Sequence, residues 1–164
     1  MADSLILVLL LASLTISILL LGVSFKWPTI GRFLFVLLFL WAAYINTKTA
    51  ILVPEEYLDY ASFAWLSIYR NFILGFFANH ITTMVITIAF FQFLIAVLLF
   101  TKGPLVKWGG WMAIFFLVSI APLGIGSGFP TTLILAAGIY LIIRKPVNHN
   151  LWEIIVDKLL ITKS

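Results

Sequence analysis

Apolar residues dominate five segments of the chain, at residues 5–23, 30–46, 81–100, 108–123 and 129–143. A helix needs about 20 such residues to cross the hydrocarbon core of a bilayer. The first three segments reach or approach this length, whereas the last two are shorter and are joined as a hairpin by a stretch rich in glycine and proline. The pattern predicts an all-α membrane protein, a single membrane domain over residues 1–164 with five spans.

Two further segments carry amphipathic patterns. In residues 54–77, aromatic and aliphatic residues recur among polar ones, which favours a helix that lies on the outer interface or caps the bundle. The alternative is that residues 65–77 form the N-terminal part of a long third span. Residues 150–160 repeat apolar residues at spacings of three and four, which predicts an interfacial helix on the cytoplasmic side.

The overall composition and the distribution of charge agree with a membrane location. The chain is 63% hydrophobic and 10% charged, and its mean hydropathy is +1.19. One side of the five predicted spans receives only Lys48 and Arg70. The other side receives eight basic residues: Lys26, Arg32, Lys102, Lys107, Arg144, Lys145, Lys158 and Lys163. Basic residues favour the cytoplasmic side.

We therefore expect an integral protein of a prokaryotic cytoplasmic membrane, with the N-terminus outside and the C-terminus in the cytoplasm. The first segment is expected to remain as an uncleaved helix, because its head has no basic side chain. The basic residues sit beside span ends, where they contact lipid, so we expect no nucleic-acid partner.

Several kinds of chemistry are excluded by residue type or position. The chain has no cysteine, which excludes thiolate and iron–sulfur sites. His80 and His149 are predicted on opposite sides of the membrane, so one haem cannot use both. Gly124, Gly126 and Gly128 lack the strand and the lysine of a phosphate-binding loop. We expect no cofactor held by the chain alone and no metal site, although a quinone stays open as a ligand.

The polar residues that could form a site are concentrated in the predicted outer segment. They could converge on a polar pocket above the bundle, and the alternative is a solvated loop in which Arg70 pairs with one acid. The candidate outer residues are Glu55, Glu56, Asp59, Tyr60, Arg70, Asn71, Asn79 and His80. Gln92, near the middle of the third span, is predicted to form an interhelical hydrogen bond or, alternatively, a polar contact to a ligand or quinone.

Several motifs of the chain follow one another in a recognisable order. They are Arg32-Phe-Leu-Phe, Pro54-x-x-Tyr57, Asn79-His80, the apolar run 89–103 and the hairpin from Pro122 to Pro130. In this order the chain resembles the DoxX-like family of small membrane proteins over about residues 30–145. The resemblance implies a four-helix bundle, to which the first helix and the interfacial helices are additions. Many members carry an acid at the position of Gln92.

The resemblance also directs the functional hypothesis, because some DoxX-like proteins are implicated as subunits or partners of membrane redox systems. It favours a non-catalytic component that supports a membrane complex, for example together with a redox subunit. The second hypothesis is a binder or carrier of a lipid, a quinone or another small molecule. An enzyme that acts alone is the third. Membrane lipids are expected partners in each case, and the sequence leaves the oligomeric state open.

The predicted topology can be tested with reporter fusions. A reporter fused after Ser164 is expected to be active only in the cytoplasm, and one inserted within residues 46–55 only outside, because basic residues concentrate on the C-terminal side. Activity of both fusions on the same side of the membrane would contradict the five-span topology.

Overall fold

The structure is a computed structural model that describes residues 2–153, and every regular element in that range is helical. In chain order the elements are α1 (Ala2–Lys26), α2 (Pro28–Leu52), η1 (Pro54–Asp59), α3 (Tyr60–Phe63), α4 (Ser67–Leu74), η2 (Phe77–Asn79), α5 (Ile81–Phe100), α6 (Pro104–Ile120), η3 (Ala121–Ser127) and α7 (Thr131–Ile143). Here η denotes a 3₁₀ helix. The prediction of an all-helical chain is confirmed for the described residues.

Four stretches are long and apolar enough to cross a membrane, namely Leu7–Lys26, Pro28–Leu52, Ile81–Phe100 and Pro104–Ser127. The fourth consists of α6 with η3. α7 is also apolar but has only 13 residues, a length of about 20 Å at the rise of an α-helix. It is shorter than the hydrocarbon layer of about 30 Å. The structure therefore supports an integral membrane protein with four candidate spans and one shorter apolar helix.

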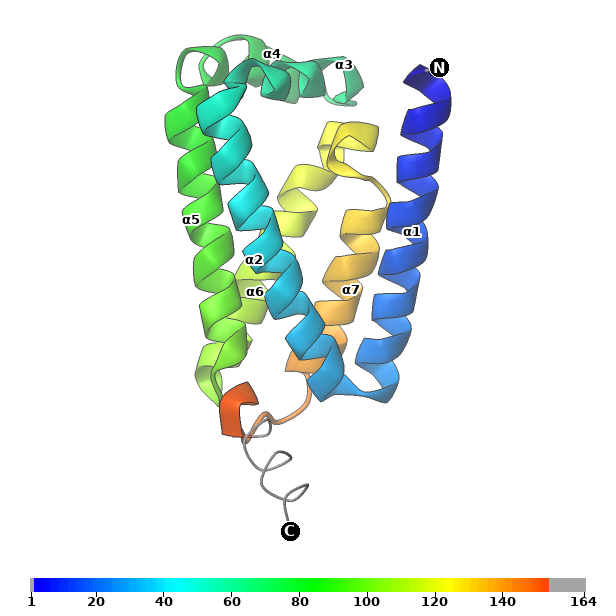
Figure 1. Ribbon diagram of the computed structural model, residues 1–164, viewed down its shortest axis with the longest axis vertical. Coiled ribbons are helices and arrows are strands. Elements are labelled where there is room, and N and C mark those ends of the chain that lie inside the picture. The colour runs from blue at the N-terminus through cyan, green and yellow to red at the C-terminus, as the bar shows by residue number, and fades with distance from the viewer. Residues whose placement is uncertain (1, 154–164) are drawn as a thin grey trace.

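The long helices form a bundle in which α2 packs along α5 and α1 packs along α7, while α6 contacts both α5 and α7 (Figure 1). One end holds the α1–α2 connection, the α5–α6 turn and the segment after α7. We call it the basic end, because Lys26, Arg32, Lys102 and Arg144 lie there. The opposite end is the capped end.

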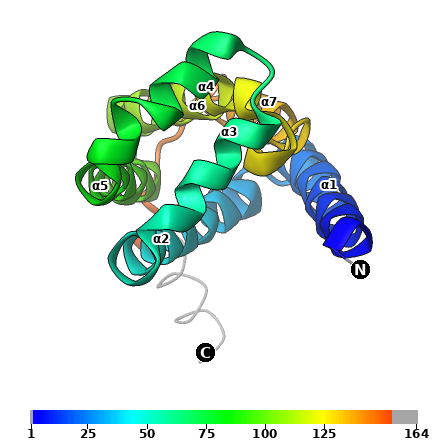
Figure 2. The same ribbon diagram turned by 90° about the horizontal axis from the view of Figure 1, so that it is seen from above.

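The segment η1–α3–α4–η2, which we call the cap, crosses the capped end of the bundle (Figures 1 and 2). Extended backbone at Ala64 and Leu66 separates α3 from α4, so the predicted amphipathic segment is a series of short helices. The cap is fixed to the α6–η3–α7 region by two hydrogen bonds. The Trp65 N–H donates to the Pro122 carbonyl at 3.1 Å, and the Tyr69 hydroxyl donates to the Ser119 carbonyl at 2.7 Å.

Two predicted boundaries differ from the structure in ways that affect the site. α2 continues to Leu52, beyond the predicted end at residue 46, so Asn46 lies inside the helix and not at its end. A helix can include Asn46, Thr47 and Thr49 because its backbone hydrogen bonds do not require apolar side chains. α5 begins at Ile81, so residues 65–77 are not an extension of the third span. The predicted helix over 150–160 is helical from 151 to 153, and the remainder lies outside the described residues.

Buried apolar side chains form two clusters. The larger one, in the half towards the basic end, includes Phe35, Ile95, Leu99 and Ile139. The smaller one lies beneath the cap and includes Ile73, Phe77 and Val85. Both clusters contain residues of α2 and of α5. Apolar packing therefore holds these two helices together towards both ends of the bundle.

The contact between α1 and α2 depends on a glycine. A Cβ atom at Gly31 would lie 2.8 Å from the Cα atom of Ser24, and Ser24 is fully buried. A clash with backbone is relieved only if a helix moves. The absence of a side chain at Gly31 therefore sets the distance between the two helices at this point.

Gly31→Ala is expected to lower the free energy of unfolding by about 1–3 kcal/mol, because the added methyl group overpacks the α1–α2 contact. Chemical unfolding in micelles, followed by tryptophan fluorescence, measures this change. Gly22→Ala on α1 is the matched control, since nothing lies within 4 Å of its added Cβ. Equal stability of the two variants would contradict the close contact.

Candidate functional site

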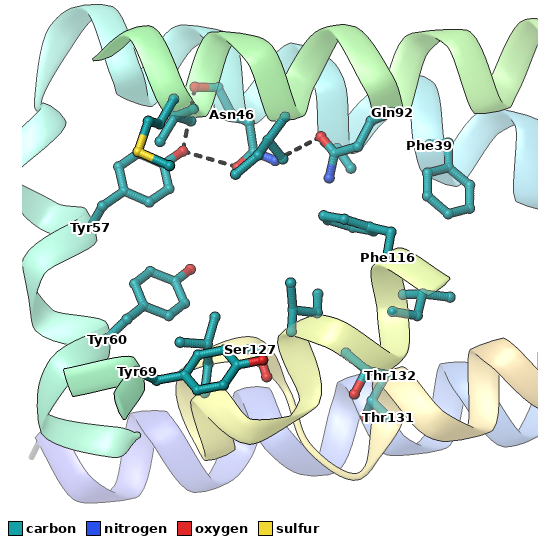
Figure 3. A pocket seen from close by; sticks show the side chains of 18 of the residues that line it. Phe39, Asn46, Tyr57, Tyr60, Tyr69, Gln92, Phe116, Ser127, Thr131 and Thr132 are labelled. Carbon is teal, nitrogen blue, oxygen red and sulfur yellow. Dashed lines mark hydrogen bonds between the residues drawn. The ribbon is translucent and has the colours of Figure 1, made fainter. Parts of the chain in front are cut away.

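A pocket of about 490 Å³ lies between the two clusters. α2 and α5 form one wall, α6, η3 and α7 form the other, and the cap, at the left in Figure 3, covers one end. Most lining residues are aliphatic or aromatic. The polar lining side chains are Asn46, Tyr57, Tyr60, Tyr69, Gln92, Ser127, Thr131 and Thr132.

A chain of hydrogen bonds enters this pocket from the cap. The Tyr57 hydroxyl of η1 donates to Asn46 Oδ1 of α2 at 2.9 Å. Asn46 Nδ2 in turn donates to Gln92 Oε1 of α5 at 2.7 Å (Figure 3). The carbonyl oxygen of Gln92 is thus used between helices. Its amide nitrogen, Nε2, points into the pocket and donates to no acceptor within the described residues.

Two hydroxyl groups add to the polar atoms of the pocket. The Tyr60 side chain reaches from the cap into the open space with its hydroxyl foremost (Figure 3), and none of the described residues hydrogen-bonds to it. Thr132 is only 3% exposed, and its Oγ1 is buried without a partner in the described part of the chain. Buried polar atoms are normally hydrogen-bonded, so Thr132 Oγ1 is an exception. The Tyr60 hydroxyl, which is open to the space, indicates where a bound molecule would be held.

The tyrosines at the roof of the pocket remain protonated near neutral pH. Burial, together with the neighbouring Tyr60 ring, raises the pKa of Tyr57 to about 12. Burial and the nearby Glu56 carboxylate also raise the pKa of Tyr60. Both hydroxyls therefore keep the proton that they donate.

Among the described residues, none that lines the pocket is Asp, Glu, Lys, Arg or His, so this part of the wall carries no charge. The described residues also contain no group of three or more potential metal ligands. A charged ligand would lose its hydration without finding an opposite charge. The arrangement therefore suits a neutral, mostly apolar molecule that accepts hydrogen bonds.

The structure separates the predicted outer residues from this pocket. Of the eight, only Tyr60 lines the pocket. The others lie on the exposed outer side of the cap or at the start of α5: Glu55, Glu56, Asp59, Arg70, Asn71, Asn79 and His80. No hydrogen bond or ion pair joins any two of the eight side chains in the described structure.

Arg70 and His80 make local contacts instead. Arg70 Nε donates to the Ala61 carbonyl at 3.2 Å, so the pair that we expected between Arg70 and a carboxylate is not formed among the described residues. The His80 ring stacks on Phe76 with centroids 4.5 Å apart, and its Nδ1 lies 2.9 Å from the Phe76 carbonyl. These contacts hold the cap in shape and leave both side chains on the surface.

Sequence reasoning identified Gln92 as a polar contact but missed Asn46, Tyr57 and Thr132 as parts of the same site. Asn46 is the last residue of the predicted second span, and its amide in a mostly apolar stretch could have been matched with Gln92 on the next span. Thr132 carried no comparable signal, because threonines often bond within their own helix, as Thr87 does to the Thr83 carbonyl.

Comparison with known protein families, with curated protein sequences and with solved structures finds no match for this chain. The resemblance to the DoxX-like family stays a prediction from the motifs. The pocket itself is the evidence from which a function can be argued.

Gln92→Leu is expected to lower the free energy of unfolding by about 1–2 kcal/mol, because Asn46 Nδ2 loses its acceptor between α2 and α5. Thr87→Val on the exposed face of α5 is the matched control and should change stability by less than about 0.5 kcal/mol. Unfolding in micelles gives both values. If the two variants were equally stable, the bond between the helices would contribute nothing.

Proposed function

We propose that this protein binds a neutral, lipophilic molecule with hydrogen-bond acceptors in the pocket beneath the cap. The observation that carries the proposal is a pair of donors, Gln92 Nε2 and the Tyr60 hydroxyl, that have no acceptor among the described residues and face an apolar space of about 490 Å³. Pockets that bind small molecules commonly have volumes of about 300–1,000 Å³, mostly apolar walls and a few polar groups that orient the ligand.

A quinone head group fits these requirements best. It is neutral, its flat ring suits a pocket with Tyr60, Tyr69, Phe72 and Phe116 in the wall, and its two carbonyl oxygens accept hydrogen bonds from separate donors. A phospholipid would place a phosphate in the pocket, where none of the described lining residues is basic. The donors thus favour a quinone-like molecule over a charged lipid.

The ligand would enter from the membrane beside α2. Trp41 lines the pocket and is also 62% exposed on the outside of the bundle, so the pocket borders the surface that faces lipid. A lipophilic molecule would pass this edge without crossing water. Its apolar tail could remain between α2 and the surrounding lipid.

In the membrane, the proposed architecture has five crossings of the DoxX-like type. η3 and the turn at Gly128 would complete the short crossing of α7, because irregular backbone at membrane depth is tolerated where other protein covers it. The cap and the α6 end provide that cover through Trp65 and Tyr69. The charge distribution supports an orientation in which the basic end is cytoplasmic and the pocket lies towards the outside.

Ligand binding is compatible with the hypothesis from the sequence, in which the chain is a non-catalytic component of a membrane complex. A protein that holds a quinone-like molecule beside a redox enzyme would serve as such a component. Co-purification of a redox subunit from native membrane supports this role, and purification of the chain alone with its ligand supports a separate binder.

Purified protein is expected to bind decylubiquinone, a quinone with a short tail, as measured by tryptophan quenching and native mass spectrometry. Gln92→Leu and Tyr60→Phe should each weaken binding by about fivefold to tenfold, the value of one hydrogen bond. Decylbenzene, which has no carbonyl oxygens, should bind more weakly than the quinone.

Tyr44→Phe is the control, because Tyr44 is an exposed tyrosine of α2 that does not line the pocket. It should bind the quinone as the unmodified protein does. Equal affinity of Tyr60→Phe and Tyr44→Phe, with Gln92→Leu also unchanged, would show that the donors do not hold the ligand.

A further inference from the structure

Arg32 lies in the first turns of α2 at the basic end and is only 2% exposed. Its Nη2 donates to the His149 carbonyl at 2.9 Å, and its Nη1 donates to the Thr101 carbonyl at 3.3 Å. Its Nε is buried and has no partner in the described part of the chain. The guanidinium therefore connects the α5–α6 turn to the segment after α7 through neutral carbonyl groups.

No negative charge compensates this guanidinium within residues 2–153. The carboxylate of Glu153, which lies at the same end, pairs with Lys102 at 2.8 Å and faces His149 at 3.7 Å. Carbonyl oxygens offer partial charge only, and a buried cation is normally paired with an anion. Among the described residues, the charge of Arg32 at the basic end therefore has no counterpart.

A second pocket of about 260 Å³ adjoins this arginine. It lies between the start of α2 and the segment that follows α7, and it is separate from the ligand pocket beneath the cap. Its lining residues are Pro28, Thr29, Arg32, Ile142, Lys145, Pro146, Val147, Asn148 and His149. Within the described part of the chain, the wall includes the cation of Lys145 and the hydroxyl of Thr29, but no carboxylate.

The N-terminus of α2 adds to the positive potential of this pocket. Pro28 opens the helix, and no side chain caps its free N–H groups. The backbone dipoles of a helix of 25 residues place partial positive charge at this end, where anions bind well. Arg32, Lys145 and the helix end are thus three independent sources of positive potential around one small space.

We propose that this second pocket binds a phosphate group, and that the head group of an anionic phospholipid supplies it. The planar guanidinium offers several donors to phosphate oxygens, with Lys145 as a second cation and the Thr29 hydroxyl as a neutral donor. The pocket lies where the long helices end, which is the level of lipid head groups. The proposal does not depend on the function assigned to the pocket beneath the cap.

Native mass spectrometry of the full chain in micelles at physiological ionic strength tests this site. The probes are dioleoyl phosphatidylglycerol, dioleoylglycerol, which has the same acyl chains without the phosphate, and inorganic phosphate. The phospholipid is expected to bind, and dioleoylglycerol is not. The proposed lipid source would be wrong if the phospholipid did not bind and inorganic phosphate bound instead, with an affinity that the substitutions described next weaken.

Arg32→Gln should weaken binding of the phospholipid by about tenfold or more, the effect of losing a hydrogen bond to a charged group. Because this variant also disturbs the contacts of Arg32 with two carbonyls, Lys145→Gln provides a second measurement on an exposed side chain. It should weaken binding by about fivefold. Thermal stability of each variant, measured without lipid, separates folding from binding.

Arg144→Gln is the matched control, since it removes the same charge from the adjacent exposed residue, which does not line the pocket. Its effect should stay below about twofold, because isolated surface charges are screened. Equal effects of Arg144→Gln and Lys145→Gln would show that the phospholipid is attracted by the general surface charge and not bound in the pocket. Asp157 lies outside the described residues, and stronger binding by Asp157→Asn would assign the counter-charge to Asp157 and overturn the proposal.

Discussion

The packing of α2 against α5 is the contact on which the rest of the bundle depends. Between helices in lipid, burial of apolar surface gives little gain, so association relies on close packing and on hydrogen bonds. Both occur here. Asn46 bonds to Gln92, and Thr82 Oγ1 donates to the Ala50 carbonyl at 3.1 Å nearer the capped end. Small side chains at Ala50 and Ala89 are buried along the same contact.

This contact also determines the chemistry of the larger pocket. Because Asn46 satisfies the Gln92 carbonyl, the Gln92 amide is turned with its nitrogen towards the open space. Tyr57 orients Asn46 from the cap, so the cap, α2 and α5 together set the direction of a single donor. A change at Tyr57 would therefore alter the direction of the Gln92 donor, although neither Tyr57 nor Asn46 needs to touch a bound molecule.

The helical fold followed from the sequence because hydrocarbon leaves few alternatives. Hydrocarbon offers no water to the backbone, so the N–H and carbonyl groups of each segment must hydrogen-bond to one another. Long apolar runs therefore become helices. The start of α5 at Ile81 agrees with the predicted one, since Asn79 and His80 interrupt the apolar run before it. The end of α2 was predicted too early. The polar side chains in residues 46–49 lie in more polar surroundings than the apolar part of α2, but the helix continues past them.

The candidate site was less predictable, because the sequence does not state which way a side chain points. Charged residues of the cap drew the prediction to the outer surface, yet the same short helices turn Tyr57 and Tyr60 inward. These tyrosines alternate with Glu56 and Asp59, which stay exposed. Only the tertiary contacts that tie Trp65 and Tyr69 to the region around η3 decide which face of the cap is the inner one.

Under the proposed function, the shortness of α7 determines the medium from which the ligand would be drawn. Since its 13 residues extend about 20 Å, Thr131 and Thr132 at its start lie below the capped end. If the bundle spans a bilayer, the pocket floor that they line would lie at the depth of acyl chains. A lipophilic molecule partitions into that layer before it meets the protein. Occupancy then follows the mole fraction of ligand among the lipids, so a weak intrinsic affinity suffices for a compound that is almost absent from water.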